Sequence, residues 1–236
     1  MSIADNVKYI LENIRNAAHS AGKDPSSVTL CAATKMNSAE RVQEAIAAGI
    51  TCCGENRVQE LIDKLEKNAY AGAQVHFIGH LQTNKVKYVV GNVDLIQSVD
   101  SLRLLDAINK EAAKKRIVQN ILLELNLAGE ESKSGFSIQE TLNIIPQLAQ
   151  YCHIKVLGFM TIPPICHNSG ENDKIFQEMY NLSVDITAKK YDNIEASILS
   201  MGMSDDYTDA IRCGSNMVRI GTAIFGARDY SKSNQG

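Results

Sequence analysis

The chain has 236 residues, 44% of them hydrophobic and 22% charged, an ordinary globular composition that excludes disordered, collagen-like and coiled-coil proteins. Its 24 lysines and arginines against 27 aspartates and glutamates give a net charge of −3, so no basic excess indicates nucleic acid or an anionic membrane as a partner. At roughly 150 residues per domain, the length allows one domain or two.

Residues 1–20 form the first predicted element, a helix with one buried face. Its apolar positions are Ile3, Val7, Ile10, Leu11, Ile14 and Ala17. Asp5, Lys8 and Glu12 interrupt this run, which excludes a signal peptide, and no later run approaches the length of a membrane span. We therefore expect a cytoplasmic protein with no membrane partner.

After Pro25, short apolar runs rich in β-prone residues alternate with helical stretches. The runs are residues 28–34, 51–53, 74–79, 94–99, 118–126, 154–162, 195–202 and 217–226. The helices between them are expected near residues 38–48, 58–65, 86–90, 104–112, 138–149, 175–186 and 204–212.

This alternation predicts an α/β fold with a parallel sheet. Eight strands, seven intervening helices and a leading helix fit a single (β/α)8 TIM-like barrel with an extra N-terminal helix, which fills the place of the eighth helix. An open doubly wound sheet is the alternative, but the turn TKMNS after the first strand lacks G-x-G-x-x-G. We expect one domain over residues 1–230 and a disordered tail over 231–236.

Six cysteines, at positions 31, 52, 53, 152, 166 and 213, include no C-x-x-C pair. Their spacing is typical neither of a disulfide framework nor of a zinc motif. We expect reduced thiols, mostly in or near the core, and no metal site.

Unusual residues collect where the predicted strands end, which in a barrel is the edge that carries the chemistry. They are Lys35, Asn56, His80, Met160, Thr161, Ser200, Gly202, Gly221 and Thr222. Lys35 directly ends an apolar strand, where loss of water would lower the pKa of its ammonium and allow the amine to attack a carbonyl. The alternative is that Lys35 reaches out to solvent beside the strand end.

Phosphate sites in barrels commonly lie after strands seven and eight. Gly202 and Gly221 would let backbone N–H groups approach an anion, and Ser200 and Thr222 would add hydroxyls, although the glycines could equally serve turns alone. The neighbouring carboxylates of Asp205 and Asp206 would repel a phosphate, so we expect both to point away from it.

Arg219 lies two residues before Gly221 in an apolar strand, so both face the same side. A guanidinium inside a barrel needs a partner, and the sequence leaves a structural carboxylate and a ligand equally open. Together, Lys35, the phosphate cradle and Arg219 describe a pocket for pyridoxal 5′-phosphate. Lys133, in a loop at the same mouth, would contact the phosphate rim or accept the cofactor during transfer, unless it is only a solvated loop residue.

At these residues the sequence resembles the pyridoxal phosphate homeostasis protein family, also called the YggS-like or proline synthase co-transcribed family. The matching stretches are AATK (32–35), GENRVQE (54–60), HFIGHLQTNK (76–85), GEESKSGF (129–136), GFMTIP (158–163), LSMGMSDD (199–206) and VRIGTAIFGARDY (218–230). They span nearly the whole chain.

The resemblance implies a barrel like the N-terminal domain of alanine racemase, with pyridoxal phosphate bound to Lys35 as an aldimine. It also implies that Ser200, Gly221 and Thr222 hold the phosphate, beside the Gly202 expected above, and that Arg219 faces the pyridine nitrogen. Asn56, His80 and Met160 would line the ring. The sequence departs from the family at Met36-Asn37 and at Cys52-Cys53, neither of which touches these ligands.

Three functions compete. The first is a carrier, without robust catalysis, that acts in intracellular pyridoxal phosphate homeostasis and indirectly in amino and keto acid metabolism, with apo forms of cofactor-dependent enzymes as recipients. The second is an amino-acid racemase, disfavoured because two-base chemistry needs a group on each face of the cofactor, and we expect no second domain after Gly226 to supply one. The third is an aldolase that uses Lys35 without the cofactor.

Overall fold

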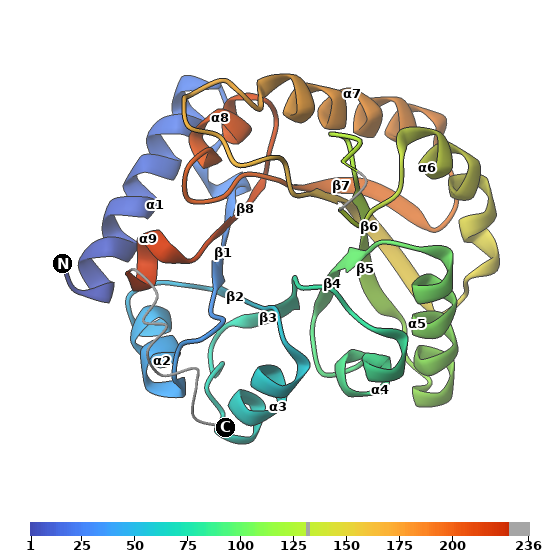
Figure 1. The fold of residues 1–236 in the computed structure, drawn as a ribbon, viewed down its shortest axis with the longest axis horizontal. Helices are drawn as coiled ribbons and strands as arrows, with labels where there is room; N and C mark the ends of the chain where they lie inside the picture. Colours follow the sequence, from blue (N-terminus) through green and yellow to red (C-terminus); the bar gives the residue numbers. More distant parts are fainter. Residues whose placement is uncertain (131–132, 227–236) are drawn as a thin grey trace.

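The structure is a computed structural model, and it describes residues 1–130 and 133–226. Eight parallel strands close into a barrel in sequence order (Figure 1). They are β1 (Thr29–Ala33), β2 (Cys52–Glu55), β3 (Gln74–Phe77), β4 (Leu95–Val99), β5 (Gln119–Leu125), β6 (Ile154–Thr161), β7 (Ile194–Ser200) and β8 (Met217–Ile220). The predicted (β/α)8 barrel is confirmed, and the open sheet is wrong because β1 pairs with β8.

The helices form a ring outside the strands (Figure 1). They are α1 (Ile3–Ser20), α2 (Ala39–Ala47), α3 (Val58–Glu66), α4 (Val86–Val89), α5 (Leu102–Lys115), α6 (Ile138–Ile144), α7 (Asp173–Lys189), α8 (Tyr207–Arg212) and α9 (Thr222–Phe225). Three 3-10 turns, η1 (Pro25–Ser27), η2 (Thr83–Lys85) and η3 (Ile145–Gln150), complete the described elements. None of the helices in the described ranges has the length and apolar character needed to cross a bilayer.

The leading helix α1 closes the ring as predicted, because it packs against α8, α9 and α2. Its first turn is fixed by a capping box, in which Ser2 and Asp5 satisfy each other's backbone N–H groups. The Asn6 side chain donates to the carbonyl of Ile224 in α9 over 2.8 Å, which ties the start of the chain to its last described helix.

The prediction for the last strand was wrong at its end. A single run over residues 217–226 was expected, but β8 stops at Ile220 and α9 follows Gly221. The apolar Ala-Ile-Phe segment has the composition of a strand, which is why the sequence predicts one there. In the structure, Ile224 and Phe225 are instead buried on a helical turn beside α1. The proposed domain end at residue 230 and the tail over 231–236 lie outside the described residues.

The strands separate two apolar layers. The larger layer lies between the strands and the helices, and the smaller one fills the barrel. Side chains of the inner layer come from six strands and the end of β3: Cys31, Cys52, Ile78, Leu95, Leu122, Met160 and Met217. Because successive side chains on a strand alternate, the neighbours of these residues face the helices.

Candidate functional site

Closure of the barrel brings the first and last strands side by side. Ala32 of β1 is the register partner of Ile220 of β8. Just beyond, a Cβ atom on Gly221 would lie 3.2 Å from the carbonyl oxygen of Ala33, so glycine permits this close approach. The segment after β8 therefore lies beside the end of β1, where Lys35 is half-buried.

A buried ion pair holds the backbone that carries Lys35. Lys64 of α3 contacts the Glu55 carboxylate at 2.5 Å and also donates to the carbonyl oxygen of Thr34 over 2.8 Å. The Glu55 carboxylate accepts a further hydrogen bond from the Tyr70 hydroxyl at 3.0 Å. Since Thr34 immediately precedes Lys35, this network fixes where the lysine leaves the strand.

The residue after Lys35 has an unusual backbone. Met36 adopts a φ of 61°, a left-handed conformation that costs about 1–2 kcal/mol in a non-glycine residue. Its N–H donates to the carboxylate of Glu60 over 2.6 Å, and the Asn37 side chain donates to the carbonyl of Lys35 over 3.0 Å. These bonds stabilise the sharp change of direction that follows the lysine. The expectation that the Met36-Asn37 departure touches none of the proposed ligands is wrong at Asn37, because its side chain bonds to the Lys35 backbone.

Arg219 lies inside the barrel and is 5% exposed. Its guanidinium donates to the Ser200 hydroxyl over 2.6 Å and to the carbonyl oxygen of Thr161 over 2.8 Å. Burial lowers the pKa of this guanidinium, while Cys31 and Glu124 oppose that shift. Within the described ranges no carboxylate forms an ion pair with Arg219, so its protein partners are neutral oxygens.

Ser200 contacts this guanidinium, and Met160 and Gly202 lie next to Ser200 and to the Arg219 backbone. The Ser200 hydroxyl is buried and donates to Oε1 of Gln97 over 2.6 Å, and Met160 is the register partner of Ser200. The Gly202 carbonyl accepts from the backbone N–H of Arg219 over 3.0 Å. A Cβ atom on Gly202 would lie 2.6 Å from that of Ala210, so this position requires glycine.

The other predicted residues lie across the same mouth. Thr222 is exposed at the start of α9. Asn56 and His80 line a cavity of about 230 Å³ with Glu124, Asn126, Lys133 and Ile162 among its walls. The Oδ1 atom of Asn56 is buried without a hydrogen-bond partner. His80 is exposed, with Nδ1 3.1 Å from a carboxylate oxygen of Asp100.

Lys133 lines this cavity, as expected of a loop at the mouth. It is half-buried, and its ammonium contacts the Glu130 carboxylate at 2.8 Å. The loop is held by the Asn126 side chain, which donates to the carbonyls of both Glu130 and Lys133.

Glu124 is a site residue that the sequence reasoning missed. It lies near the end of β5 and is 9% exposed. Burial, followed by repulsion from Asp100, raises the pKa of its carboxyl to about 7, and Arg219 opposes this rise. The sequence does show this glutamate within the apolar run ILLELN. The strand pattern alone, however, does not tell a buried glutamate from one exposed at the edge of a sheet.

Asp206 and Tyr207 lie at the start of α8. Asp206 is buried, and its carboxylate accepts from the Asn172 side chain over 2.9 Å and from the Met203 N–H over 2.7 Å. Tyr207 is 9% exposed, and its hydroxyl accepts from the Asn13 side chain of α1 over 3.2 Å. Tyr207 therefore joins two helices of the outer ring.

The profile of the family described as "Alanine racemase, N-terminal domain" matches residues 6–229. A pyridoxal phosphate homeostasis protein from Aquifex aeolicus is 40% identical, with 98% of this chain and 100% of that protein covered. One from Pasteurella multocida is 38% identical over the same shares. The chain belongs to the pyridoxal phosphate homeostasis protein family. The resemblance drawn from the motifs is confirmed.

Solved structures agree with this family. PipY of Synechococcus elongatus, solved with pyridoxal phosphate bound, has a TM-score of 0.82 and 29% identity, covering 95% of this chain and 100% of that one. A Bifidobacterium adolescentis protein has a TM-score of 0.89 and 36% identity, covering 94% of each chain. An alanine racemase from Clostridium difficile, at 16% identity, a TM-score of 0.67 and coverage of 96% of this chain and 57% of its own, shares the fold alone.

Proposed function

We propose that this chain binds pyridoxal 5′-phosphate at the carboxyl end of its barrel and acts in pyridoxal phosphate homeostasis, with indirect effects on amino and keto acid metabolism. One observation carries this proposal: β8 pairs with β1, so Gly221 and Thr222 follow β8 beside the end of β1, two residues before Lys35. The amine of Lys35 and the backbone and hydroxyl donors of Gly221 and Thr222 therefore lie at the same end of the barrel.

The residues present fit this cofactor. The buried guanidinium of Arg219 has only neutral oxygen partners among the described residues, and the Oδ1 atom of Asn56 is buried without a partner. Both are suited to a polar ligand, because a buried polar group without a bond costs free energy. The close approach at Gly221 also keeps the phosphate side of the mouth free of a side chain.

When bound, pyridoxal phosphate supplies an aldehyde that condenses with a primary amine. In our proposal Lys35 provides that amine and is the site of covalent attachment. Ser200, Gly202, Gly221 and Thr222 bind the phosphate, and Asn56, His80 and Met160 surround the ring. The ion pair of Glu55 and Lys64 positions the amine through the carbonyl of Thr34.

Arg219 determines what the site can do with its ligand. A guanidinium facing the pyridine nitrogen offers a fixed positive charge and only donors, so it keeps that nitrogen unprotonated. An unprotonated ring withdraws electrons less strongly, which suits holding the cofactor better than catalysis. We therefore propose a carrier without robust turnover, whose recipients are apo forms of cofactor-dependent enzymes.

No observation specifically favours either alternative function, the racemase or the aldolase. Racemisation by two bases needs a second acid or base on the opposite face, and no tyrosine is among the described residues that line the cavity. An aldolase acting through Lys35 alone would ignore added pyridoxal phosphate.

The test is a visible absorption spectrum of the isolated protein, followed by borohydride reduction and mass mapping of the modified residue. We expect a yellow protein modified at Lys35, and a colourless but folded Lys35→Ala variant. Lys23→Ala, another partly buried lysine outside the mouth, should keep the colour. A folded, colourless wild type that ignores added pyridoxal phosphate would refute the proposal, and rapid racemisation of amino acids would instead favour an enzyme.

A further inference from the structure

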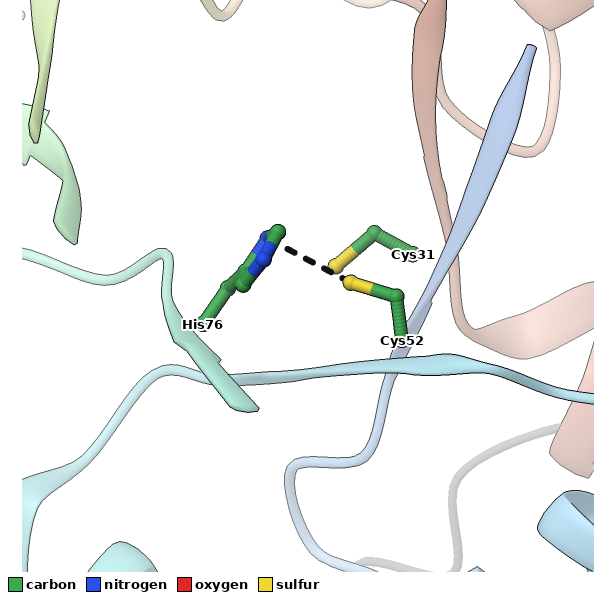
Figure 2. A group of neighbouring side chains, drawn as sticks. All are labelled: Cys31, Cys52 and His76. Carbon is green, nitrogen blue, oxygen red and sulfur yellow. Dashed lines mark hydrogen bonds between the residues drawn. The ribbon is translucent and has the colours of Figure 1, made fainter. Parts of the chain in front are cut away.

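A second cluster of reactive side chains lies inside the barrel, apart from Lys35. Cys31 of β1, Cys52 of β2 and His76 of β3 point toward one another from three consecutive strands (Figure 2). Their exposed fractions are 0%, 1% and 3%. Each offers one ligand atom, and these three atoms lie within 4.8 Å of one another.

We propose that Cys31, Cys52 and His76 bind a thiophilic metal ion, Cu⁺ or Zn²⁺, in the barrel interior. Two sulfurs and one imidazole nitrogen are the donors that both ions prefer. Zinc–sulfur bonds are about 2.3 Å long, so tetrahedral ligand atoms lie about 3.8 Å apart, a separation compatible with this cluster. The Sγ atom of Cys52 already lies 3.3 Å from Nδ1 of His76.

The surrounding hydrogen bonds orient the imidazole for this role. Arg219 can only donate, so the Ser200 hydroxyl accepts from it and gives its own proton to Oε1 of Gln97. The NH₂ group of Gln97 must then face Nδ1 of His76, which lies 2.9 Å away. Nδ1 is therefore the unprotonated nitrogen of a neutral imidazole, the form that binds metals, and an ion bound there would replace the Gln97 N–H at its lone pair.

The thiols supply the charge that the ion requires. Cysteine binds a metal ion as the thiolate, so loading this site at neutral pH would release thiol protons of Cys31 and Cys52 to solvent.

This site does not depend on the proposed function, because none of its ligands is assigned to pyridoxal phosphate. Arg219 distinguishes the two ions electrostatically. Two thiolates with Cu⁺ leave one negative charge, which the nearby guanidinium offsets, whereas Zn²⁺ neutralises both thiolates and needs a fourth ligand. The thioether sulfur of Met217, 3.2 Å from the Gln97 amide nitrogen, is a soft ligand that suits Cu⁺, whereas zinc would take water as its fourth ligand.

The experiment produces the full chain in medium supplemented with zinc or with copper, so that it folds around the ion. Purification is anaerobic, and metal content is measured after gel filtration. We expect about one ion per chain with at least one metal, and at least a tenfold weaker retention against a chelator in Cys31→Ala and Cys52→Ala. Cys53→Ala is the matched control, because Cys53 is adjacent to Cys52 but faces the outer layer.

A triple variant, Cys152→Ser, Cys166→Ser and Cys213→Ser, should keep the metal, since these cysteines lie outside the barrel interior. Loss of metal in this variant would assign the ion to surface thiols and overturn the proposal. If the buried variants do not fold, X-ray absorption of the wild type decides. Two sulfur ligands at about 2.3 Å support the site. Metal-free chains, or ligands of oxygen and nitrogen alone, refute it.

Discussion

At the scale of single residues, Glu124 shows how the barrel changes a side chain's chemistry. Its carboxyl is buried at the mouth near another carboxylate, that of Asp100, and its pKa rises to about 7 from an ordinary 4.5. The folded state therefore keeps a proton that the unfolded chain releases. The stabilising effect is complete below pH 4.5 and is lost as the pH rises to about 7.

We expect Glu124→Gln to remove this pH dependence from the cofactor-free protein. Relative to the variant, the wild type should lose about 2–3 kcal/mol of unfolding free energy between pH 4.5 and pH 8, since one pKa unit is worth about 1.4 kcal/mol. Urea unfolding of both proteins across this range measures the difference. Glu178→Gln on the exposed face of α7 is the control. A Glu124→Gln effect that is constant with pH would contradict the raised pKa.

At the scale of elements, β6 contains a bulge that reverses which residues face inward. Its register against β7 shifts between Val156 and Gly158. Leu157 packs on the inner layer and Phe159 belongs to the outer one, yet Met160 again faces inward, which strict alternation would forbid. The irregular strand therefore determines that Met160 borders Ser200.

The bulge requires Gly158, which has a φ of 154° and leaves no room for a side chain. A Cβ atom there would lie 2.0 Å from the carbonyl oxygen of Ile198. We expect Gly158→Ala to lower the unfolding free energy by about 3 kcal/mol or more. Gly22→Ala, with a φ of 68° and no atom within 4 Å of its Cβ position, should lose only about 1–2 kcal/mol. Urea unfolding of both variants measures these losses. If Gly158→Ala and Gly22→Ala lost the same unfolding free energy, the backbone around residue 158 would have shifted to relieve the clash, and the prediction would be wrong.

At the scale of the whole molecule, the two ends of the described chain depend on each other. The helix α1 covers the region where β8 meets β1, and it packs against α8 and α9. Its buried face meets the C-terminal helices, and the barrel itself closes only where β8 pairs with β1. The structure thus predicts cooperative unfolding of the barrel rather than separate loss of its halves.

We expect Ile10→Ala to lower the unfolding free energy by about 2–5 kcal/mol, because Ile10 is 2% exposed within α1. Circular dichroism and tyrosine fluorescence should show one shared transition in the variant. Tyr9→Ala, on the exposed face of the same helix, should change stability by no more than about 0.5 kcal/mol. Two separate transitions in Ile10→Ala would contradict a single cooperative unit.

Much of the fold could be predicted because each element carries a local signal. The period of apolar residues in α1 and the short β-prone runs depend on near neighbours along the chain, so they identified all eight strands. The prediction failed at residues 222–225, where an apolar segment beside glycine forms a helical turn against α1. There, packing from a distant element outweighed local composition.

The site divides in the same way. The sequence by itself placed Lys35, Arg219 and the glycines at strand ends, because strand direction and family motifs are both readable along the chain. The tertiary structure decided that Arg219 bonds to Ser200 and Thr161, that Glu124 is buried, and that Cys31 and Cys52 meet His76. These relations cross between strands far apart in the sequence, and barrel closure sets both the contacts and the low dielectric around them.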